Sequence, residues 1–405
     1  MVSRQAARLV AGTPAIAVAH FAAEADPYHP TGNPAGYVNL GTAENRLVWD
    51  LLAPRLRAAR PVGADDTRYA PLFGTRRLRE STARFLTARH GVPVDPEDLL
   101  VVSGVTTALD IIATALCDPG EAIAVPVPYY GALDTDLTGR SGATLLPVDP
   151  GPDDGPVPGA ETVADAVTRA RAGGTTVRAL ALTSPHNPLG RVYPADELAA
   201  LAKVCGELDL DLVTDEIYAN SVFGDAPFTS ALGLPSDLRV HTVWGFAKDF
   251  GLPGFKVGVL HTPDGSVRAA ARELAYFAPV STDTQCLLSG LLEDGAWVAG
   301  FLRTYRSRLA ASYAAATERL VAAGIGYAPA QAGLSVWVDL RPWLPSPSFD
   351  AEQALWRCLM DSGRVSITPG QVFHSPEPGW FRLCHALDAE HVRAGIDRLR
   401  AVLSH

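Results

Sequence analysis

Short runs of apolar and β-branched residues alternate with amphipathic helical patterns through the middle of the chain. Such alternation is typical of an α/β fold built on a mostly parallel sheet. Between the first two runs, apolar residues recur at helical spacing over Thr106–Leu116, which predicts a helix. The apolar runs themselves predict strands at Leu99–Val102, Ala122–Val125, Thr176–Leu182, Leu208–Val213 and Val240–Trp244.

The last hundred residues have a different pattern. A long Arg- and Ala-rich helical pattern at Trp297–Ala323 precedes three short apolar runs and a closing helix at Ala389–Leu403. The runs predict strands of a smaller sheet at Ser335–Leu340, Val365–Ile367 and Phe381–Leu383. We therefore expect a large α/β domain over residues 61–295, a small α+β domain over 296–405, and an N-terminal segment, 1–60, that belongs partly to the small domain.

Charge and cysteine content exclude several classes of function. The 34 basic and 44 acidic residues give a net charge of -10, which argues against a nucleic-acid partner. The five cysteines are scattered without a CxxC pair, so neither a disulfide framework nor a zinc site is indicated. Gly12, Pro14 and His20 interrupt the only stretch resembling a signal peptide, and no apolar run is long enough to span a membrane. We expect a cytoplasmic protein without a metal.

Ligands of open parallel sheets bind at the carboxyl ends of the strands, so the residues that follow each strand are the candidates for chemistry. The first strand is followed by Ser103, Gly104, Val105 and Thr106, which open a helix. Free backbone N–H groups at a helix start can bind a phosphate, although Ser and Thr there are more often simple caps.

The next three strand ends also carry polar side chains. Asn187 lies in a proline-rich turn, and Lys248 lies among glycines where burial can activate an amine as a Schiff-base nucleophile. Asp215 and Tyr218, three residues apart, are expected on one helical face. Each residue alone has an ordinary interpretation as a turn, cap or surface residue. Together, an amide, a carboxylate, a phenol and a lysine beside a phosphate site are the groups that hold pyridoxal phosphate.

At this point the chain resembles the fold-type I pyridoxal-phosphate enzymes of the class I/II aminotransferase superfamily, and within it the 1-aminocyclopropane-1-carboxylate (ACC) synthases. The resemblance runs from about Asn33 to Ala386 and implies a large cofactor-binding domain with a mostly parallel, seven-stranded-type sheet. The motifs that carry it, in matching order and spacing, are Asn39–Asn45, Asp118–Gly120, Pro126–Tyr130, Asn187–Gly190, Asp215–Tyr218, Lys248–Asp249 with Gly251–Phe255, and Glu377–Arg382.

The resemblance implies a role for each residue around the cofactor ring. Lys248 would form the Schiff base with the cofactor and then move the Cα proton of the substrate. Asp215 would pair with the pyridine nitrogen and keep it protonated. Asn187 and Tyr218 would hydrogen-bond the phenolic oxygen of the ring, and Tyr130 would stack on its face.

Further residues are implied for the phosphate, the substrate and the partner subunit. Val105 and Thr106 would donate hydrogen bonds to the phosphate, and Arg382 would hold the substrate carboxylate as a bidentate fork. Tyr69 falls where the family's tyrosine reaches the phosphate of the partner subunit, so a homodimer is expected. Glu44 matches a glutamate that lies beside the substrate in the synthases, and a carboxylate there suits a sulfonium cation.

The chain departs from the family pattern around the lysine and the phosphate. Gly245 and Ala247 stand where serines are usual, and Lys256 stands where an arginine normally holds the phosphate. Lysine is a point charge and not a planar fork, so the phosphate site is expected to be looser or rebuilt. The segment Tyr69–Gly74 also lacks the tyrosine–histidine pair that the synthases carry just before this glycine.

These observations predict an enzyme that removes the Cα proton of S-adenosylmethionine and expels methylthioadenosine from Cγ. The product would be ACC, or a vinylglycine-type intermediate whose γ-carbon is joined to a second substrate, as in bacterial natural-product enzymes that use a nicotinamide nucleotide. Two alternatives stay open: an amino acid aminotransferase, and a ligand-sensing regulatory domain, for which the segment before Asn33 is short and weakly charged.

Overall fold

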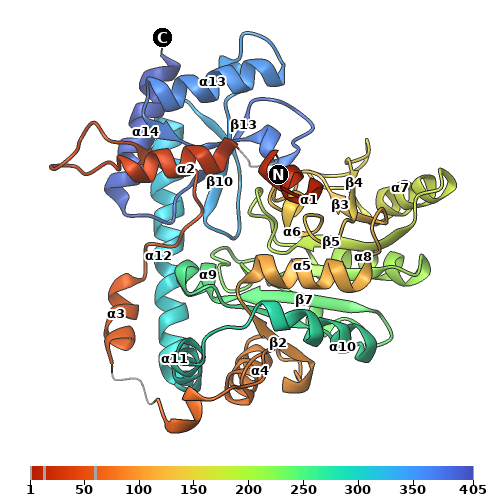
Figure 1. Ribbon diagram of the computed structural model, residues 1–405. Helices are drawn as coiled ribbons and strands as arrows, with labels where there is room; N and C mark the ends of the chain where they lie inside the picture. Colours follow the sequence, from red (N-terminus) through yellow and green to blue (C-terminus); the bar gives the residue numbers. More distant parts are fainter. Residues whose placement is uncertain (1, 12–14, 59–61, 405) are drawn as a thin grey trace.

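A seven-stranded sheet forms the centre of the larger part of the molecule (Figure 1). The computed structural model describes residues 2–11, 15–58 and 62–404. All neighbouring strands of the sheet are parallel except β8, which runs antiparallel to both β2 and β7. The strand order is β2 (Leu99–Val102), β8 (Gly258–His261), β7 (Val240–Gly245), β6 (Asp211–Asp215), β5 (Val177–Thr183), β3 (Ala122–Pro126) and β4 (Thr144–Val148).

Four of the five predicted large-sheet strands are confirmed to within one residue at either end. The prediction for Leu208–Val213 was wrong at both ends, since the strand is β6 and begins at Asp211. Helix α8 ends at Glu207 and Asp209 adopts a positive φ of 52°, so Leu208 and Leu210 belong to the connection between helix and strand. Strands β4 and β8 were not predicted; β4 is a largely solvent-accessible edge strand and β8 is only four residues long.

Helices cover both faces of this sheet. Residues of α5 (Val105–Leu116) and α10 (Gly265–Leu274) share one buried cluster with Ile123 and Val125, whereas residues of α7 (Ala160–Ala172) and α8 (Ala195–Glu207) share another with Ala122 and Ala124. Alternate residues of a strand point to opposite faces, which explains the continuous apolar runs of these strands.

The smaller part contains a four-stranded sheet of order β12 (Thr368–Pro369), β13 (Trp380–Cys384), β10 (Ser335–Asp339) and β9 (Gly326–Ala328). The single strand predicted over Val365–Ile367 is instead split, because β11 (Val365–Ser366) leaves this sheet and pairs in parallel with β1 (Val38–Asn39). The N-terminal segment thus reaches the C-terminal part. The assignment of residues to domains stays a prediction.

The remaining α-helices are α1 (Arg4–Ala11), α2 (Ala15–Ala25), α3 (Trp49–Arg57), α4 (Arg76–His90), α6 (Leu133–Asp136), α9 (Phe246–Asp249), α11 (Thr282–Glu293), α12 (Gly295–Ala322), α13 (Phe349–Asp361) and α14 (Ala389–Leu403). No helix in the described ranges is long and apolar enough to cross a membrane.

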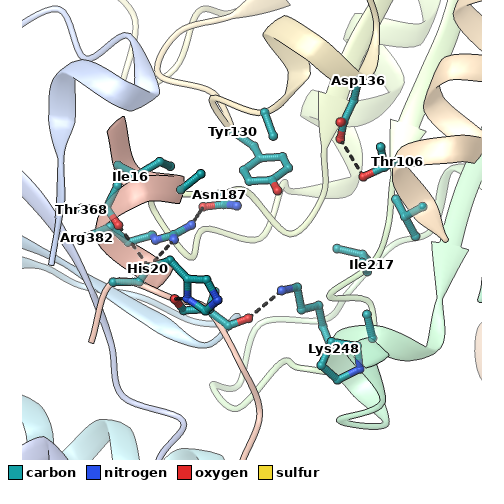
Figure 2. Close-up of a pocket in the computed structure, with 18 of the residues that line it drawn as sticks. Ile16, His20, Thr106, Tyr130, Asp136, Asn187, Ile217, Lys248, Thr368 and Arg382 are labelled. Carbon is teal, nitrogen blue, oxygen red and sulfur yellow. Dashed lines mark hydrogen bonds between the residues drawn. The ribbon is translucent and has the colours of Figure 1, made fainter. Parts of the chain in front are cut away.

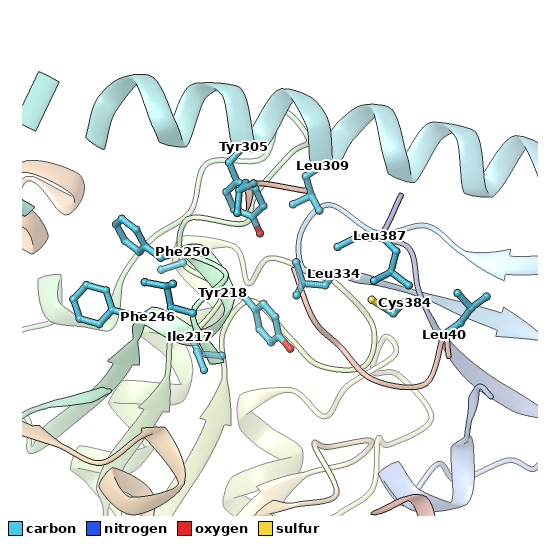
Figure 3. Close-up of a cluster of buried hydrophobic side chains, with 14 of the residues drawn as sticks. Leu40, Ile217, Tyr218, Phe246, Phe250, Tyr305, Leu309, Leu334, Cys384 and Leu387 are labelled. Atoms are coloured by element: carbon cyan, nitrogen blue, oxygen red, sulfur yellow. The ribbon is translucent and has the colours of Figure 1, made fainter. Parts of the chain in front are cut away.

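Helix α12 runs beside both parts of the molecule and buries a stripe of large side chains (Figure 1). Tyr305 and Leu309 point from it into a cluster that also holds Tyr218 of the larger part and Leu334 of the smaller part (Figure 3). All four side chains are less than a tenth exposed. Burial of this apolar surface joins the two parts where β6 ends.

One buried carboxylate connects the segments that follow β6 and β7. Asp249 Oδ2 accepts hydrogen bonds from the Asn220 backbone N–H (3.1 Å), the Asn220 amide (2.9 Å) and Trp244 Nε1 (3.1 Å). Its Oδ1 accepts from Ser221 Oγ at 2.7 Å, and Ser221 Oγ is in turn 2.8 Å from the Tyr305 hydroxyl. Burial raises the pKa of Asp249, and the four donors oppose that shift. The carboxylate therefore fixes the two segments relative to each other.

Asp249 accepts four hydrogen bonds and the Tyr305 hydroxyl makes one, so removing each in turn tests the network. We expect Asp249→Ala to lower the free energy of unfolding by about 3 kcal/mol or more, because it strands several buried donors. Tyr305→Phe, which removes one hydroxyl from the same cluster, should cost about 1 kcal/mol. Denaturant unfolding of the three proteins measures both values. Equal losses for the two variants would contradict the central place of the carboxylate.

Candidate active site

A cavity of about 470 Å³ lies at the carboxyl ends of β5, β6 and β7, between the two parts of the molecule. It collects residues from three neighbouring strand ends: Asn187 after β5, Asp215 at the end of β6, and Lys248 after β7. Nine of the predicted site residues line it, namely Val105, Thr106, Tyr130, Asn187, Asp215, Tyr218, Lys248, Lys256 and Arg382.

Lys248 lies on the short helix α9, directly after β7, and its Nζ donates to the Ala43 carbonyl at 2.6 Å (Figure 2). The Asn45 amide donates to the Lys248 carbonyl at 3.1 Å and so holds its backbone. Burial and the nearby charge of Arg382 lower the pKa of Lys248 to about 8. Far more of this amine is therefore unprotonated near neutral pH than in an ordinary lysine, which favours its action as a nucleophile.

Asp215 ends β6 with its carboxylate buried against the cavity. Its Oδ1 accepts only from the Ile217 backbone N–H, at 3.2 Å, among the described groups. Burial raises the pKa of Asp215 to about 7, so a cationic partner here would gain from pairing with it. The predicted helix that would carry Asp215 and Tyr218 on one face is wrong: the chain forms turns there, with Ser221 N–H bonded to the Tyr218 carbonyl. Both side chains nevertheless line the cavity.

Arg382 comes from β13 of the smaller sheet and is 6% exposed. Its guanidinium donates to Asn187 Oδ1 at 3.2 Å and to the Gly41 carbonyl at 2.9 Å, and it lies 4.8 Å from the ring centre of Phe373. Its Nε is buried without a hydrogen-bond partner among the described residues. A buried guanidinium with a free donor is suited to a carboxylate ligand.

The N-terminus of α5, with Gly104, Thr106 and the Lys256 side chain, forms a group we call the phosphate cup. Gly104 has a φ of 99°, and a Cβ there would lie 3.3 Å from Lys256 Nζ. A Cβ at Gly245, where the family has serine, would lie 2.8 Å from the Val105 side chain, so glycine suits this close approach. The start of α5, with free N–H groups beside a lysine, presents positive charge to the cavity.

An acid that the sequence analysis missed also lies at the cup. Asp136, on α6, accepts from Thr106 Oγ1 at 3.2 Å (Figure 2). Burial raises the pKa of Asp136 to about 6, while Thr106 and the charge of Lys256 oppose that shift. Asp136 is the last residue of α6, well beyond the end of β3 at Pro126, so reading the residues directly after each strand did not find it.

A second missed group comes from α2. Ile16, Ala17, Ala19, His20 and Phe21 of this helix form one wall of the cavity, which we call the α2 wall. Nothing in the small-residue pattern of this segment pointed to a site. Trp356, Ser366, Ile367 and Thr368 of the smaller part complete the same end of the cavity.

Two predicted site residues do not line this cavity. Tyr69 is fully exposed on the surface of the single chain. Glu44 accepts from Arg46 Nε and Nη2, at 3.1 and 2.9 Å, and lines an adjoining smaller hollow that shares Pro253 with the main cavity. Its charge still acts on Lys248, whose pKa it raises against the effect of burial.

These groups fit pyridoxal phosphate. The cup supplies donors for a phosphate, Asp215 has spare acceptor capacity for a protonated ring nitrogen, and Tyr130 offers a ring at the cavity surface. Burial raises the pKa of Tyr130 to about 12, so its ring is neutral. Two of the three lysines of the chain lie in this cavity. No group of three His, Cys, Asp or Glu in the described segments could hold a metal ion.

Comparison with known proteins agrees with this geometry. Residues 35–399 match the family described as aminotransferase class I and II. A 1-aminocyclopropane-1-carboxylate synthase of Glycine max is 35% identical over 396 residues, which cover 93% of this chain and 82% of that protein. The 1-aminocyclopropane-1-carboxylate synthase 6 of Arabidopsis thaliana is 34% identical, with 94% and 81% covered.

Solved structures give the same fold. Aspartate aminotransferase from Thermus thermophilus with maleate superposes with a TM-score of 0.79 at 26% identity, covering 99% of both chains. N-Succinyldiaminopimelate aminotransferase from Mycobacterium tuberculosis superposes with a TM-score of 0.80 at 25% identity, covering 99% of this chain and 100% of that one. The fold-type I architecture expected from the sequence is thus confirmed. The chain belongs to the class I and II aminotransferase family and is a pyridoxal-phosphate-dependent enzyme.

Proposed function

We propose that this enzyme acts on S-adenosylmethionine, removes its Cα proton and expels methylthioadenosine from Cγ. The observation that carries the proposal is the 33–36% identity to ACC synthases, which extends over 86–94% of the chain. Glu44, with the sequence around this residue, supports the proposed substrate. A carboxylate near the Lys248 amine suits a substrate that carries a sulfonium charge.

The residues of the cavity would have separate roles in this reaction. Arg382, with its free Nε donor, would hold the substrate carboxylate. The Lys248 amine, buried at the cavity, would take the Cα proton of the substrate. Pyridoxal phosphate, held by the cup and by Asp215, supplies an electron sink for the charge that develops at Cα. The pair of electrons left at Cα would then bond to Cγ and displace methylthioadenosine. If a Cβ proton is removed as well, methylthioadenosine would instead leave with formation of a Cβ–Cγ double bond.

Two products are consistent with the loss of methylthioadenosine from Cγ. If Cα itself bonds to Cγ, the product is ACC. If a second small molecule, for which a nicotinamide nucleotide is one choice, instead adds to the γ-carbon of the Cβ–Cγ double bond and a proton returns to Cβ, the product is larger. The change from the family's arginine to Lys256 alters the phosphate cup and is compatible with either product. An amino acid aminotransferase is the second candidate, favoured by the aminotransferases among the solved structures.

We further propose that the enzyme is a cytoplasmic homodimer. Tyr69 is fully exposed in the single chain, and Tyr276 and Phe277 are also large, exposed aromatic residues. If a partner subunit covered Tyr69, the Tyr69 phenol would lie towards the phosphate cup of that partner subunit. Exposed aromatic side chains are typical of contact surfaces.

Product analysis tests the proposed reaction. We expect the enzyme loaded with pyridoxal phosphate to convert S-adenosylmethionine to methylthioadenosine and either ACC or a γ-substituted amino acid, as measured by mass spectrometry. An aminotransferase would instead give a 2-oxo acid that retains the nucleoside, together with aminated cofactor. That result, without methylthioadenosine, would contradict the proposal.

A charge change at Glu44 tests the recognition of the sulfonium group. We expect Glu44→Gln to weaken binding of S-adenosylmethionine by about fivefold, the scale of a partly exposed charge pair. Binding of methionine, which is neutral at sulfur, should change much less. Titration of the cofactor absorbance with each amino acid measures both constants.

Arg46→Gln is the matched control, because it removes the partner of Glu44 and keeps the carboxylate. It should preserve the preference for the sulfonium substrate. Equal losses of S-adenosylmethionine and methionine binding in Glu44→Gln would exclude a role of this charge in substrate choice.

A further inference from the structure

The α2 wall forms one end of the cavity. This end is more apolar than the end that holds Lys248. Its residues are Ile16, Ala17, Ala19, His20 and Phe21, and most of them are apolar. Trp356 and Ile367 lie at the same cavity, and Trp356 Nε1 donates to the Ile367 carbonyl at 3.0 Å. The tryptophan donor is thus satisfied. The polar side chains at this end are His20, Ser366 and Thr368, and Thr368 Oγ1 is already bonded to the Gly41 carbonyl at 3.1 Å.

His20 is held at one ring nitrogen by a polar cluster on β1 and the loop after it. Its Nδ1 lies 2.7 Å from Thr42 Oγ1 and 3.4 Å from the Asn39 amide nitrogen. Asn39 Oδ1 accepts from the backbone N–H groups of Gly41 and Thr42, at 3.2 Å each, which fixes the orientation of its amide. The Asn39 amide nitrogen also donates to Glu24 of α2 at 3.0 Å.

This cluster favours one of the two neutral tautomers of His20. The Asn39 amide donates to Thr42 Oγ1 at 3.2 Å, so the Thr42 hydroxyl has its own proton available for His20. The two amide protons of Asn39 point to Glu24 and Thr42, and we infer that the Thr42 hydroxyl donates to Nδ1, which then acts as the acceptor. In the neutral ring the proton therefore lies on Nε2. No described residue bonds to Nε2, and His20 lines the cavity opposite Thr106 and Asp136 (Figure 2).

The same cluster ties His20 to the reacting end of the cavity. Thr42 directly precedes Ala43, whose carbonyl accepts from Lys248 Nζ at 2.6 Å. His20 is thus held through a short chain of contacts relative to the amine that moves the proton. A donor placed in this way can select the part of a substrate that extends from the reacting carbons towards α2.

We propose that His20 recognises the nucleoside arm of the substrate, with Nε2–H donating to a ribose oxygen while the α2 wall and Trp356 pack against the flat base. The inference rests on the proposed function, because only a substrate such as S-adenosylmethionine has this arm. A mostly apolar surface with one fixed donor suits a heteroaromatic ring joined to a polyhydroxylated sugar.

Two substitutions separate this role from a structural one. His20→Gln places an amide donor near the position of Nε2, whereas His20→Asn can keep the contact with Thr42 but lacks a donor at that distance. If His20 only anchors α2, the asparagine variant should be the milder one. If it binds the nucleoside arm, the glutamine variant should be the milder one.

Two sulfonium amino acids serve as probes with the enzyme loaded with pyridoxal phosphate. S-Adenosylmethionine carries the nucleoside arm, and S-methylmethionine carries the same charge and amino acid without it. We expect His20→Asn to weaken S-adenosylmethionine binding about tenfold, the scale of one lost hydrogen bond, and S-methylmethionine binding less than twofold. His20→Gln should stay close to the unsubstituted enzyme for both. Titration of the cofactor absorbance gives each dissociation constant.

Other outcomes overturn the inference in distinguishable ways. Unchanged S-adenosylmethionine binding in His20→Asn, or equal losses for both probes, would exclude recognition of the nucleoside arm and leave the proposed function intact. Failure of the unsubstituted enzyme to bind S-adenosylmethionine would overturn the proposed function and the inference together.

Discussion

The buried carboxylate of Asp249 is the interaction on which the geometry of the site depends. Its four hydrogen bonds join Asn220 and Ser221, just beyond Tyr218, to Trp244, the strand residue that precedes the lysine segment. These bonds join the segments after β6 and β7 directly, in addition to the bond from the Asn45 amide to the Lys248 carbonyl. Because a buried charge is costly unless it is fully bonded, the network also limits how far these segments can shift.

The cavity brings together charges that need ligands to balance them. Asp215 and Asp136 have carboxyl groups whose pKa values burial raises, and Arg382 retains an unused buried donor. Pyridoxal phosphate and an amino acid carry the complementary groups: a protonated ring nitrogen, a phosphate and a carboxylate. Burial is costly to these side chains in the free protein and becomes favourable when the ligands are present. This explains why so many ionisable groups lie in one cavity.

Much of the site could be predicted from the sequence because it lies where strands end. Asn187, Asp215 and Lys248 each follow a short apolar run, and neighbouring parallel strands end at one edge of the sheet. Strand ends say little about contacts made by distant segments. Strand ends therefore could not indicate that His20 would reach the cavity from α2. They were equally silent on the pairing of Glu44 with its near neighbour Arg46, since neither residue follows a strand of the large sheet. The turn after β6 was mistaken for a helix, because residues three apart can also converge through a turn.

The central claim is that Lys248, and not the lysine of the phosphate cup, is the residue that reacts with the cofactor. Reduction of the loaded enzyme with borohydride fixes the cofactor to its lysine, and peptide mass spectrometry then locates it. The chain has only three lysines, Lys203, Lys248 and Lys256, so the assignment is unambiguous. We expect the label on Lys248 alone, since burial and Arg382 lower its pKa. A label on Lys256 would contradict the arrangement described for this site.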